Sequence, residues 1–187
     1  MDHVKFHPTP LTGLTVIETT PIADERGQFS RVFCATECAA LQHDLHWVQV
    51  NVSRTYNKGT VRGMHFQYPP AAEAKLIRCL RGRVFDVAVD LRADSPTFLR
   101  WHGIELDGDG ATQFFIPKGF AHGFQALTDD AQLLYLHSAA WNREMESGLR
   151  HDDPALAIDW PLPVAQISDK DRYLQLVKKS RFAGIKP

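Results

Sequence analysis

Residues 75–91 read KLIRCLRGRVFDVAVDL, in which two short apolar runs flank an Arg-Gly dipeptide. Runs of this length joined by a glycine-containing turn predict a β-hairpin with strands at Lys75–Leu80 and Val84–Leu91. In the second strand, apolar residues alternate with a face that carries Asp86 and Asp90. A period of two places the two sets on opposite faces of a sheet. From the alternation alone, we expect the face with the aspartates to contact solvent rather than to line a polar cavity.

The rest of the chain repeats this pattern of short strands separated by turns. A spacing of about 8–12 residues between turn signals is typical of a sandwich or barrel. Helical patterns are confined to Ala35–Asp44 and to the segment after Ser168, where Ser-Asp-Lys-Asp resembles a capped first turn. We therefore predict an all-β fold, an antiparallel barrel of jelly-roll type. The other predicted strands are Leu14–Thr20, Phe29–Cys34, Trp47–Tyr56, Val61–Gln67, Arg100–Leu106, Thr112–Ile116, His122–Leu127 and Gln132–Ser138.

Length and composition narrow the class of protein. The 187 residues suit one domain, residues 1–187, with a helical tail at its C-terminal end. Lys plus Arg number 21 against 22 for Asp plus Glu, so no basic excess indicates nucleic-acid binding. No apolar segment has the length of a membrane span, and the N-terminus lacks the pattern of a secretory signal. Cys34, Cys38 and Cys79 are odd in number and lack partners at metal-ligand spacing, which predicts reduced thiols in a cytoplasmic protein.

Polar residues stand where strands are expected to be apolar. In VRGMHFQ, residues 61–67, His65 and Gln67 share one face and Arg62 lies on the other. Gly63 in this strand marks a close approach of another backbone or of a ligand. A single strand histidine is more often a structural residue than a catalyst, so its role depends on other polar groups that converge on it.

Three further polar residues lie in otherwise apolar runs. Lys75 begins the first strand of the hairpin, His122 follows a Pro-Lys-Gly turn, and Tyr135 is surrounded by leucines. Each alone fits a satisfied core or surface residue, and a buried phenol needs a hydrogen-bond partner. Together with His65 and Arg62 they come from different strands of one small barrel, which predicts a ligand pocket inside it.

The order and spacing of these motifs resemble the dTDP-4-dehydrorhamnose 3,5-epimerase family of nucleotide-sugar enzymes. The resemblance covers about residues 13–171, and its motifs are specific as a set but weak one by one. The motifs are DERG (24–27), VQVN (48–51), VRGMHFQ (61–67), KLIRC (75–79), VFDVAVD (84–90), SPTF (95–98), IPKGFAHGF (116–124), IDWP (158–161) and SDKD (168–171).

This resemblance implies a cupin-type jelly roll and a homodimer in which an N-terminal segment crosses to the partner's site. By position, His65 is the proton acceptor, Asp171 orients it, and Tyr135 is the proton donor on the opposite face of the sugar. Trp141 matches an aromatic residue that stacks on the nucleotide base. The other residues that match substrate-binding positions are Arg62, Gln67, Lys75, His122, Gln49, Asn51, Glu146 and Lys170, together with Arg26, Phe29 and Arg31 from the exchanged segment.

The implied reaction explains these residue types. A hydrogen next to a ketone becomes acidic only when the enolate is stabilised, and Lys75 or His122 would supply that electrostatic stabilisation. A histidine backed by a carboxylate is a suitable base near neutral pH. Inversion then needs an acid on the other face, and a phenol serves. The substrate is a nucleotide-linked 4-keto-6-deoxy sugar, with the dTDP-linked sugar favoured, and neither a metal nor a redox cofactor is required.

Departures from the family pattern leave alternatives open. Arg31 replaces an acidic residue, Val50 an aspartate, and Leu136 a lysine common in many bacterial members. These changes bear on which sugar is used and on whether C3, C5 or both are inverted. A non-catalytic nucleotide-sugar-binding barrel is a further alternative. A metal-dependent cupin would need a second histidine where Gln67 stands.

Overall fold

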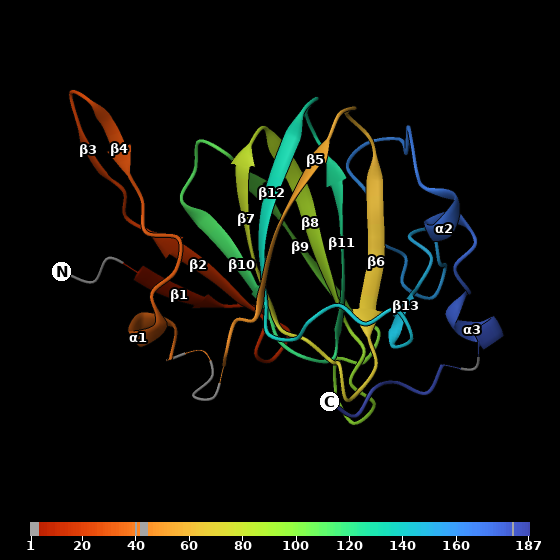
Figure 1. Ribbon diagram of the computed structural model, residues 1–187. Helices are drawn as coiled ribbons and strands as arrows, with labels where there is room; N and C mark the ends of the chain where they lie inside the picture. The colour runs from red at the N-terminus through yellow and green to blue at the C-terminus, as the bar shows by residue number, and fades with distance from the viewer. Residues whose placement is uncertain (1–3, 40, 42–44, 181) are drawn as a thin grey trace.

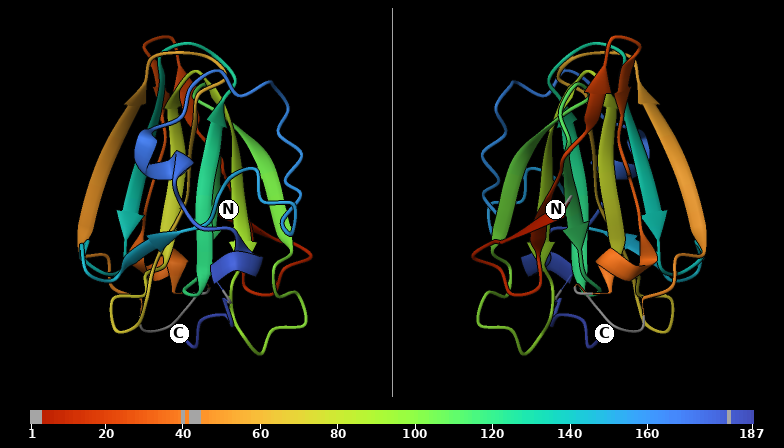
Figure 2. Two further views of the ribbon diagram at one scale, coloured as in Figure 1. Left: turned by 90° about the vertical axis from the view of Figure 1, so that its right-hand side faces the viewer. Right: turned by 90° about the vertical axis from the view of Figure 1, so that its left-hand side faces the viewer.

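The computed structural model describes residues 4–39, 41, 45–180 and 182–187, and in it two antiparallel sheets face each other (Figures 1 and 2). One sheet has the strand order β1 (Val4–Pro8), β2 (Thr15–Thr19), β10 (Thr112–Ile116), β7 (Lys75–Arg81), β12 (Ala131–His137) and β5 (Gln49–Thr55). The other has the order β13 (Glu146–Gly148), β6 (Val61–Gln67), β11 (Phe120–Ala126), β8 (Arg83–Asp90) and β9 (Trp101–Asp107). The predicted antiparallel jelly roll is confirmed.

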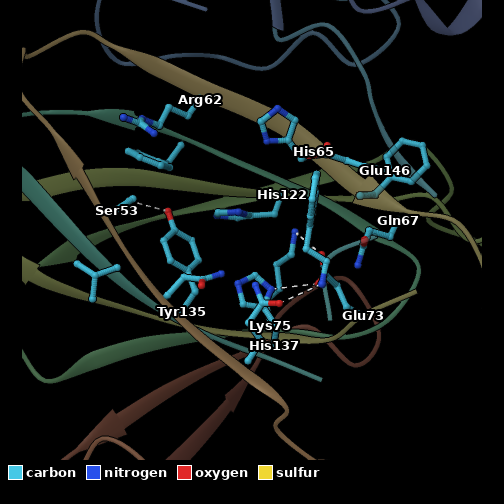
Figure 3. A pocket seen from close by; sticks show the side chains of 16 residues that line it. Ser53, Arg62, His65, Gln67, Glu73, Lys75, His122, Tyr135, His137 and Glu146 are labelled. Carbon is cyan, nitrogen blue, oxygen red and sulfur yellow. Dashed lines mark hydrogen bonds and ion pairs between the residues drawn. The ribbon is translucent and has the colours of Figure 1, made fainter. Parts of the chain in front are cut away.

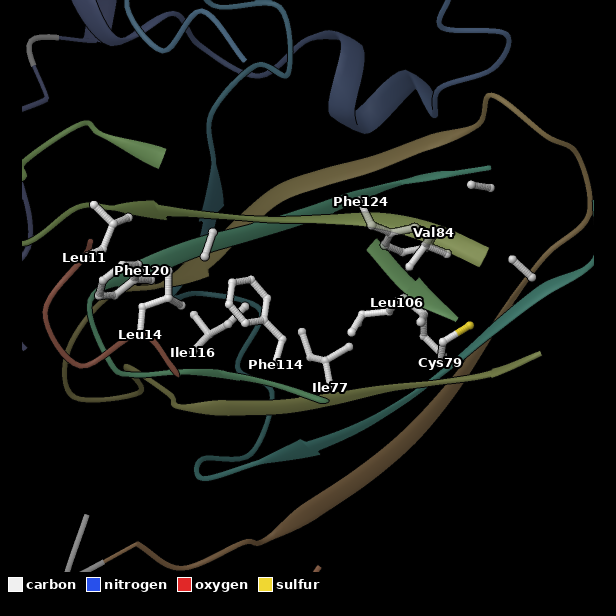
Figure 4. Close-up of a cluster of buried hydrophobic side chains, with 14 residues drawn as sticks. Leu11, Leu14, Ile77, Cys79, Val84, Leu106, Phe114, Ile116, Phe120 and Phe124 are labelled. Carbon is white, nitrogen blue, oxygen red and sulfur yellow. The ribbon is translucent and has the colours of Figure 1, made fainter. Parts of the chain in front are cut away.

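The space between the two sheets is filled in part by an apolar cluster (Figure 4). It includes Ile77 from β7, Phe114 from β10 and Val84 from β8, all with no exposed surface. Their positions follow from the alternation of each strand, because the inward residues of the two sheets meet across the barrel. Phe124 of β11 belongs to this cluster and also borders the cavity described below.

The outer faces of the two sheets are covered differently. The C-terminal segment runs over the outer face of the five-stranded sheet (Figure 2), where Leu156, Val177 and Ile185 pack on Val87 and Val89. This packing explains why both faces of β8 are buried. The expectation that its aspartate face meets solvent is wrong, because that face points into the barrel.

The outer face of the six-stranded sheet is only partly covered. Phe6 of β1 and Trp47 pack against Leu76 and Leu136 there. At the edge strand β5, by contrast, Val50 and Val52 remain exposed, as does Val48 just before the strand.

A short hairpin of β3 (Ile22–Asp24) and β4 (Gly27–Phe29) projects away from both sheets (Figure 1). The predicted strand Phe29–Cys34 is therefore wrong beyond its first residue. The ladder ends at the Ile22–Phe29 pair because the preceding Pro21 has no N–H to continue it. Residues 30–34 lead instead into a single helical turn.

The helices are short. The predicted helix Ala35–Asp44 appears as α1 (Ala35–Cys38), and its residues 40 and 42–44 lie outside the described residues. The C-terminal tail contains α2 (Asp169–Arg172) and α3 (Val177–Ser180). The predicted cap of α2 is confirmed, because Ser168 Oγ accepts a hydrogen bond from the Asp171 N–H at 3.1 Å. Within the described part of the chain, no helix is both long and apolar enough to cross a membrane.

Candidate active site

A cavity of about 300 Å³ lies between the two sheets (Figure 3). Strands of both sheets contribute to it, so groups on opposite walls face each other. From the six-stranded sheet and its loops come Gln49, Asn51, Val52, Ser53, Glu73, Lys75, Tyr135, His137 and Trp141. From the five-stranded sheet come Arg62, His65, Phe66, Gln67, His122, Phe124 and Glu146.

A bulge in β6 turns two predicted site residues toward the same cavity. Strict alternation placed Arg62 and His65 on opposite faces, and this expectation is wrong because both line the cavity. Opposite the single residue Gly123 of β11, β6 has two residues between its paired positions, which breaks the alternation. Gly63 has φ of +128°, and a Cβ there would lie 2.5 Å from the Gly123 Cα. The predicted close backbone approach at Gly63 is confirmed.

His65 is held by a buried carboxylate from the C-terminal tail. Its Nε2–H donates to Asp171 Oδ1 at 2.6 Å, and the Gly63 N–H donates to Asp171 Oδ2 at 3.2 Å. Burial opposes ionisation of Asp171, but the hydrogen bonds from His65 and Gly63 outweigh it and hold its pKa below the ordinary value. Because Nε2 carries the proton, the Nδ1 lone pair of His65 is free to accept another.

Tyr135 stands on the opposite wall, on β12 of the six-stranded sheet (Figure 3). Its hydroxyl shares a hydrogen bond of 3.2 Å with the Ser53 hydroxyl of the neighbouring strand β5. Burial raises the pKa of Tyr135 far above its ordinary range, so the phenol keeps its proton. The geometry thus places an unprotonated imidazole nitrogen and a protonated phenol on facing walls.

His122 lies between these two groups and is occupied by a second carboxylate. Its Nε2–H donates to both oxygens of Asp86, each at 3.0 Å. Asp86 is fully buried and comes from the β8 face that alternation alone assigned to solvent. Burial lowers the pKa of His122 despite the nearby Asp86, so its ring is neutral near pH 7. Its ring packs edge-on against Tyr135, with the centroids 5.9 Å apart.

Lys75 belongs to a third buried group. Its Nζ lies 3.2 Å from Glu73 Oε1, and Glu73 Oε2 accepts a hydrogen bond from His137 Nδ1 at 3.1 Å. Burial opposes ionisation of Glu73, but His137 and Lys75 together hold its pKa below the ordinary value. The cavity therefore contains an ammonium group with its own counter-ion.

The rim of the cavity is tied together by side-chain amides. Gln67 donates to the Ala140 carbonyl at 3.3 Å and accepts from the Asn142 N–H at 2.6 Å, so its amide fixes the loop that carries Trp141. Gln49 accepts from the Trp141 N–H at 3.0 Å. The Trp141 side chain remains 55% exposed, so its ring is available for stacking.

Glu146 lines the other side of the cavity, and its partner Lys170 lines a neighbouring hollow that shares Arg62 and His65 with the cavity. Lys170 Nζ lies 2.8 Å from Glu146 Oε2. Burial opposes ionisation of Glu146, but its hydrogen bonds with Lys170 and Trp141 hold its pKa below the ordinary value. Arg62 extends from the bulged strand and donates to the Arg54 carbonyl at 3.2 Å. Asn51 lines the cavity from β5.

The structure does not bring every predicted site residue to the cavity. Arg26 and Phe29 lie on the projecting hairpin, where the Phe29 residue is 68% exposed. Arg26 pairs with Asp24 at 2.5 Å, and Arg31 pairs with Glu37 at 2.8 Å. None of the three lines the cavity of this chain.

Four polar residues that line or support the cavity were not predicted from the sequence: Ser53, Glu73, Asp86 and His137. Two of them could have been found, because side chains two positions apart on a strand share a face. Ser53 follows Asn51 by two on β5, and His137 follows Tyr135 by two on β12. Among the described residues, no three His, Cys, Asp or Glu side chains are grouped as metal ligands.

Comparison with known proteins agrees with this geometry. Residues 8–179 match the sequence profile of the dTDP-4-dehydrorhamnose 3,5-epimerase family. A dTDP-4-dehydrorhamnose 3,5-epimerase of Sinorhizobium fredii is 40% identical over 172 residues, which cover 91% of this chain and 88% of the relative. A dTDP-4-dehydrorhamnose 3-epimerase of Streptomyces niveus is 37% identical over 185 residues, covering 98% and 89%.

A solved structure is similar over its whole length. It is the Legionella pneumophila dTDP-6-deoxy-D-glucose-3,5-epimerase in complex with dTDP-4-keto-L-rhamnose. The TM-score is 0.92 and the identity 39%, with 99% of this chain and 100% of that chain covered.

Proposed function

The chain belongs to the dTDP-4-dehydrorhamnose 3,5-epimerase family, and from this premise we propose its reaction. It epimerises dTDP-4-dehydro-6-deoxy-D-glucose at C3 and C5 to dTDP-4-dehydro-L-rhamnose through enolate intermediates. The observation that carries the proposal is the His65–Asp171 pair on one wall of the cavity and the Tyr135 phenol on the other. A base and an acid on facing walls are what inversion at a carbon requires.

The proton balance follows from the hydrogen bonds. His65 Nδ1 takes the proton from the carbon next to the ketone, and the resulting imidazolium is stabilised by the Asp171 carboxylate. The electrons move onto the ketone oxygen, giving an enolate. Tyr135 then returns a proton to the same carbon from the opposite face. The His65 imidazolium gives its proton to solvent and the Tyr135 phenolate takes one from solvent, which restores both groups for the next inversion. No atom is oxidised or reduced, so no redox cofactor takes part.

Lys75, and not His122, is the group we assign to the enolate oxygen. His122 already donates its Nε2–H to Asp86, and its neutral ring offers only a lone pair at Nδ1. The Lys75 ammonium has three donors, and Glu73 occupies one of them. A buried cation aimed at developing negative charge is usually a large contribution to catalysis.

The nucleotide end of the substrate is assigned to the rim. Arg62 from the cavity and Lys170 from the neighbouring hollow supply positive charge for the diphosphate. The exposed Trp141 supplies a stacking surface for the base. Gln49 and Asn51 offer hydrogen bonds on the same side. The near-zero net charge of the chain makes these local groups necessary.

We propose further that two copies form a homodimer in which the β3–β4 hairpin crosses to the partner. In this chain Arg26 and Phe29 reach no site, and Phe29 and Ile22 expose more than half of their surface. The exposed face of β5, with Val50 and Val52, offers apolar area for such contact. A crossing hairpin would bring an arginine and an aromatic ring to the partner's nucleotide site. We place the enzyme in the cytoplasm because its three cysteines are all free thiols.

The test is turnover of dTDP-4-keto-6-deoxyglucose in deuterated water, with a reductase to trap the product and NMR to count deuterium at C3 and C5. We expect deuterium at both carbons. His65→Asn should abolish incorporation while the protein still binds dTDP. Incorporation that persists in His65→Asn would remove this residue from its assigned role.

A single-centre epimerase is the second candidate, favoured by the similarity to the 3-epimerase of Streptomyces niveus. Deuterium at only one carbon in the same experiment would establish it. Binding without any incorporation would favour a non-catalytic nucleotide-sugar-binding barrel.

A further inference from the structure

Lys75 belongs to a group of three connected side chains, of which the reaction described above gives a role to Lys75 alone. Glu73 precedes β7, Lys75 begins it, and His137 ends the neighbouring strand β12. Their side chains are 9%, 8% and 13% exposed. Three ionisable groups buried together need a reason, because an unpaired buried charge costs several kcal/mol.

The carboxylate of Glu73 is fixed at both oxygens. Oε1 faces the Lys75 ammonium at 3.2 Å and Oε2 accepts from His137 at 3.1 Å. A lysine ammonium ends a flexible four-carbon stem and rotates freely unless a partner holds it. Because His137 prevents the carboxylate from turning, Oε1 stays directed at Lys75. The position of the ammonium thus depends also on the imidazole of His137, which lies opposite Lys75 on the neighbouring strand.

The same imidazole also packs against Tyr135, the residue assigned as proton donor. The His137 ring is stacked near Tyr135, with 5.9 Å between centroids and 23° between planes. Tyr135 and His137 are two positions apart on β12 and both face the cavity (Figure 3). One side chain therefore connects the group assigned to the ketone oxygen with the group assigned as proton donor.

We propose that Glu73 and His137 are positioning residues, which fix the Lys75 ammonium relative to Tyr135 and so set where the ketone oxygen binds. This inference rests on the proposed role of Lys75 in the epimerase reaction. His137 acts through Glu73, and Glu73 acts through Lys75. Misplacing a catalytic group by about 1 Å costs on the order of 10²-fold in rate.

The test compares kcat and KM of four variants in the coupled epimerase assay. Glu73→Gln removes the charge that holds the ammonium, and we expect kcat to fall about 10- to 100-fold with KM changed less than about threefold. His137→Ala should lower kcat about tenfold. His137→Asn keeps a donor near the Nδ1 position, so it should recover kcat to within about threefold of the wild type.

The double variant Glu73→Gln/His137→Ala decides whether the two residues act in series. If they do, its kcat matches that of Glu73→Gln within about twofold, because His137 has no carboxylate left to hold. Glu105→Gln, a change from carboxylate to amide on β9 outside the cavity, is the matched control and should leave kcat unchanged. If Glu73→Gln does not fold, the comparison of His137→Ala with His137→Asn carries the test.

Three outcomes would overturn the proposal. An unchanged or raised kcat in Glu73→Gln would mean that Glu73 only neutralises Lys75. Losses that multiply in the double variant would mean that the residues act independently. A His137→Asn variant no better than His137→Ala would mean that the ring only packs against Tyr135. A wild type without epimerase activity, by contrast, would refute the proposed function itself.

Discussion

Replacing Asp171 by asparagine is expected to abolish most catalysis while leaving the fold nearly intact. Both oxygens of the Asp171 carboxylate already accept hydrogen bonds, one from His65 Nε2 and one from the Gly63 N–H. An amide has only one oxygen, so its NH₂ group must face one of these donors. The Asp171 side chain is 4% exposed, so water does not resolve the conflict.

The magnitudes decide which way the amide turns. If the amide NH₂ faced the Gly63 N–H, two buried donors would meet and remain unsatisfied, which costs about 1–3 kcal/mol of stability. Facing it toward His65 only requires the imidazole to move its proton from Nε2 to Nδ1. The second arrangement is cheaper, and it removes the Nδ1 lone pair that faces the substrate. A wrong tautomer in such a pair costs on the order of 10⁴ in kcat, so we expect a loss of about 10³- to 10⁴-fold.

The assay is deuterium incorporation from solvent together with thermal unfolding. Loss of a charge-assisted hydrogen bond should lower stability by only about 1 kcal/mol, which is roughly 2–4 °C in Tm for a chain of this size. Glu105→Gln is the control, because it makes the same change from carboxylate to amide on β9, outside the cavity. It should keep kcat within about twofold. An Asp171→Asn enzyme with more than about a tenth of the wild-type rate would refute the tautomer argument.

Three further predictions concern the opposite wall, the bulge and pH. Tyr135→Phe keeps the ring but removes the phenolic proton. NMR should then show that deuterium exchange continues while inversion falls about 10²-fold or more. A ratio of inversion to exchange equal to that of the wild type would exclude Tyr135 as the proton donor. Gly63→Ala should lower Tm by roughly 6–12 °C, for about 3 kcal/mol, because φ is +128° and its Cβ would lie 2.5 Å from Gly123. Gly27→Ala, at φ +130° with open space around it, should lose less, and equal losses would mean that the clash is unimportant. Burial lowers the pKa of His122. The contribution of its neutral ring to stability is therefore full above the unfolded pKa of about 6.5 and is lost as the pH falls below that value. In urea unfolding, His122→Asn should reduce the fall in unfolding free energy between pH 7 and pH 5.

Most of the sheet architecture could be predicted because the alternation of each strand is strong. Every predicted strand from Trp47–Tyr56 onward corresponds to an observed strand. The failures have local causes. The edge strand β1 was not predicted because it ends in proline, and β4 stops where its partner reaches Pro21. The environment of the aspartate face of β8 was also predicted wrongly, because periodicity separates two faces but does not say what covers each one.

The site was predictable where a motif marked a residue, and less so where the backbone departs from regular geometry. His65, Lys75 and Tyr135 were identified from the sequence and do line one cavity. Arg62 and His65 both line the cavity only because β6 contains a bulge, and a bulge is not visible in a pattern of period two. Supporting residues such as Glu73 were missed because a carboxylate before a strand looks like any surface residue until its burial is known.

Three histidines of the cavity each have a carboxylate partner, so pairing alone does not identify the base. Burial does. The side chain of His65 is 31% exposed, whereas those of His122 and His137 are 7% and 13% exposed. A base must become charged as it accepts a proton, and deep burial penalises the charged form. His65 combines access to substrate with a buried carboxylate that stabilises its cation, and the two more buried rings are suited to holding neighbours in place. The different roles that we propose for the three histidine–carboxylate pairs thus follow from how deeply each imidazole ring is buried.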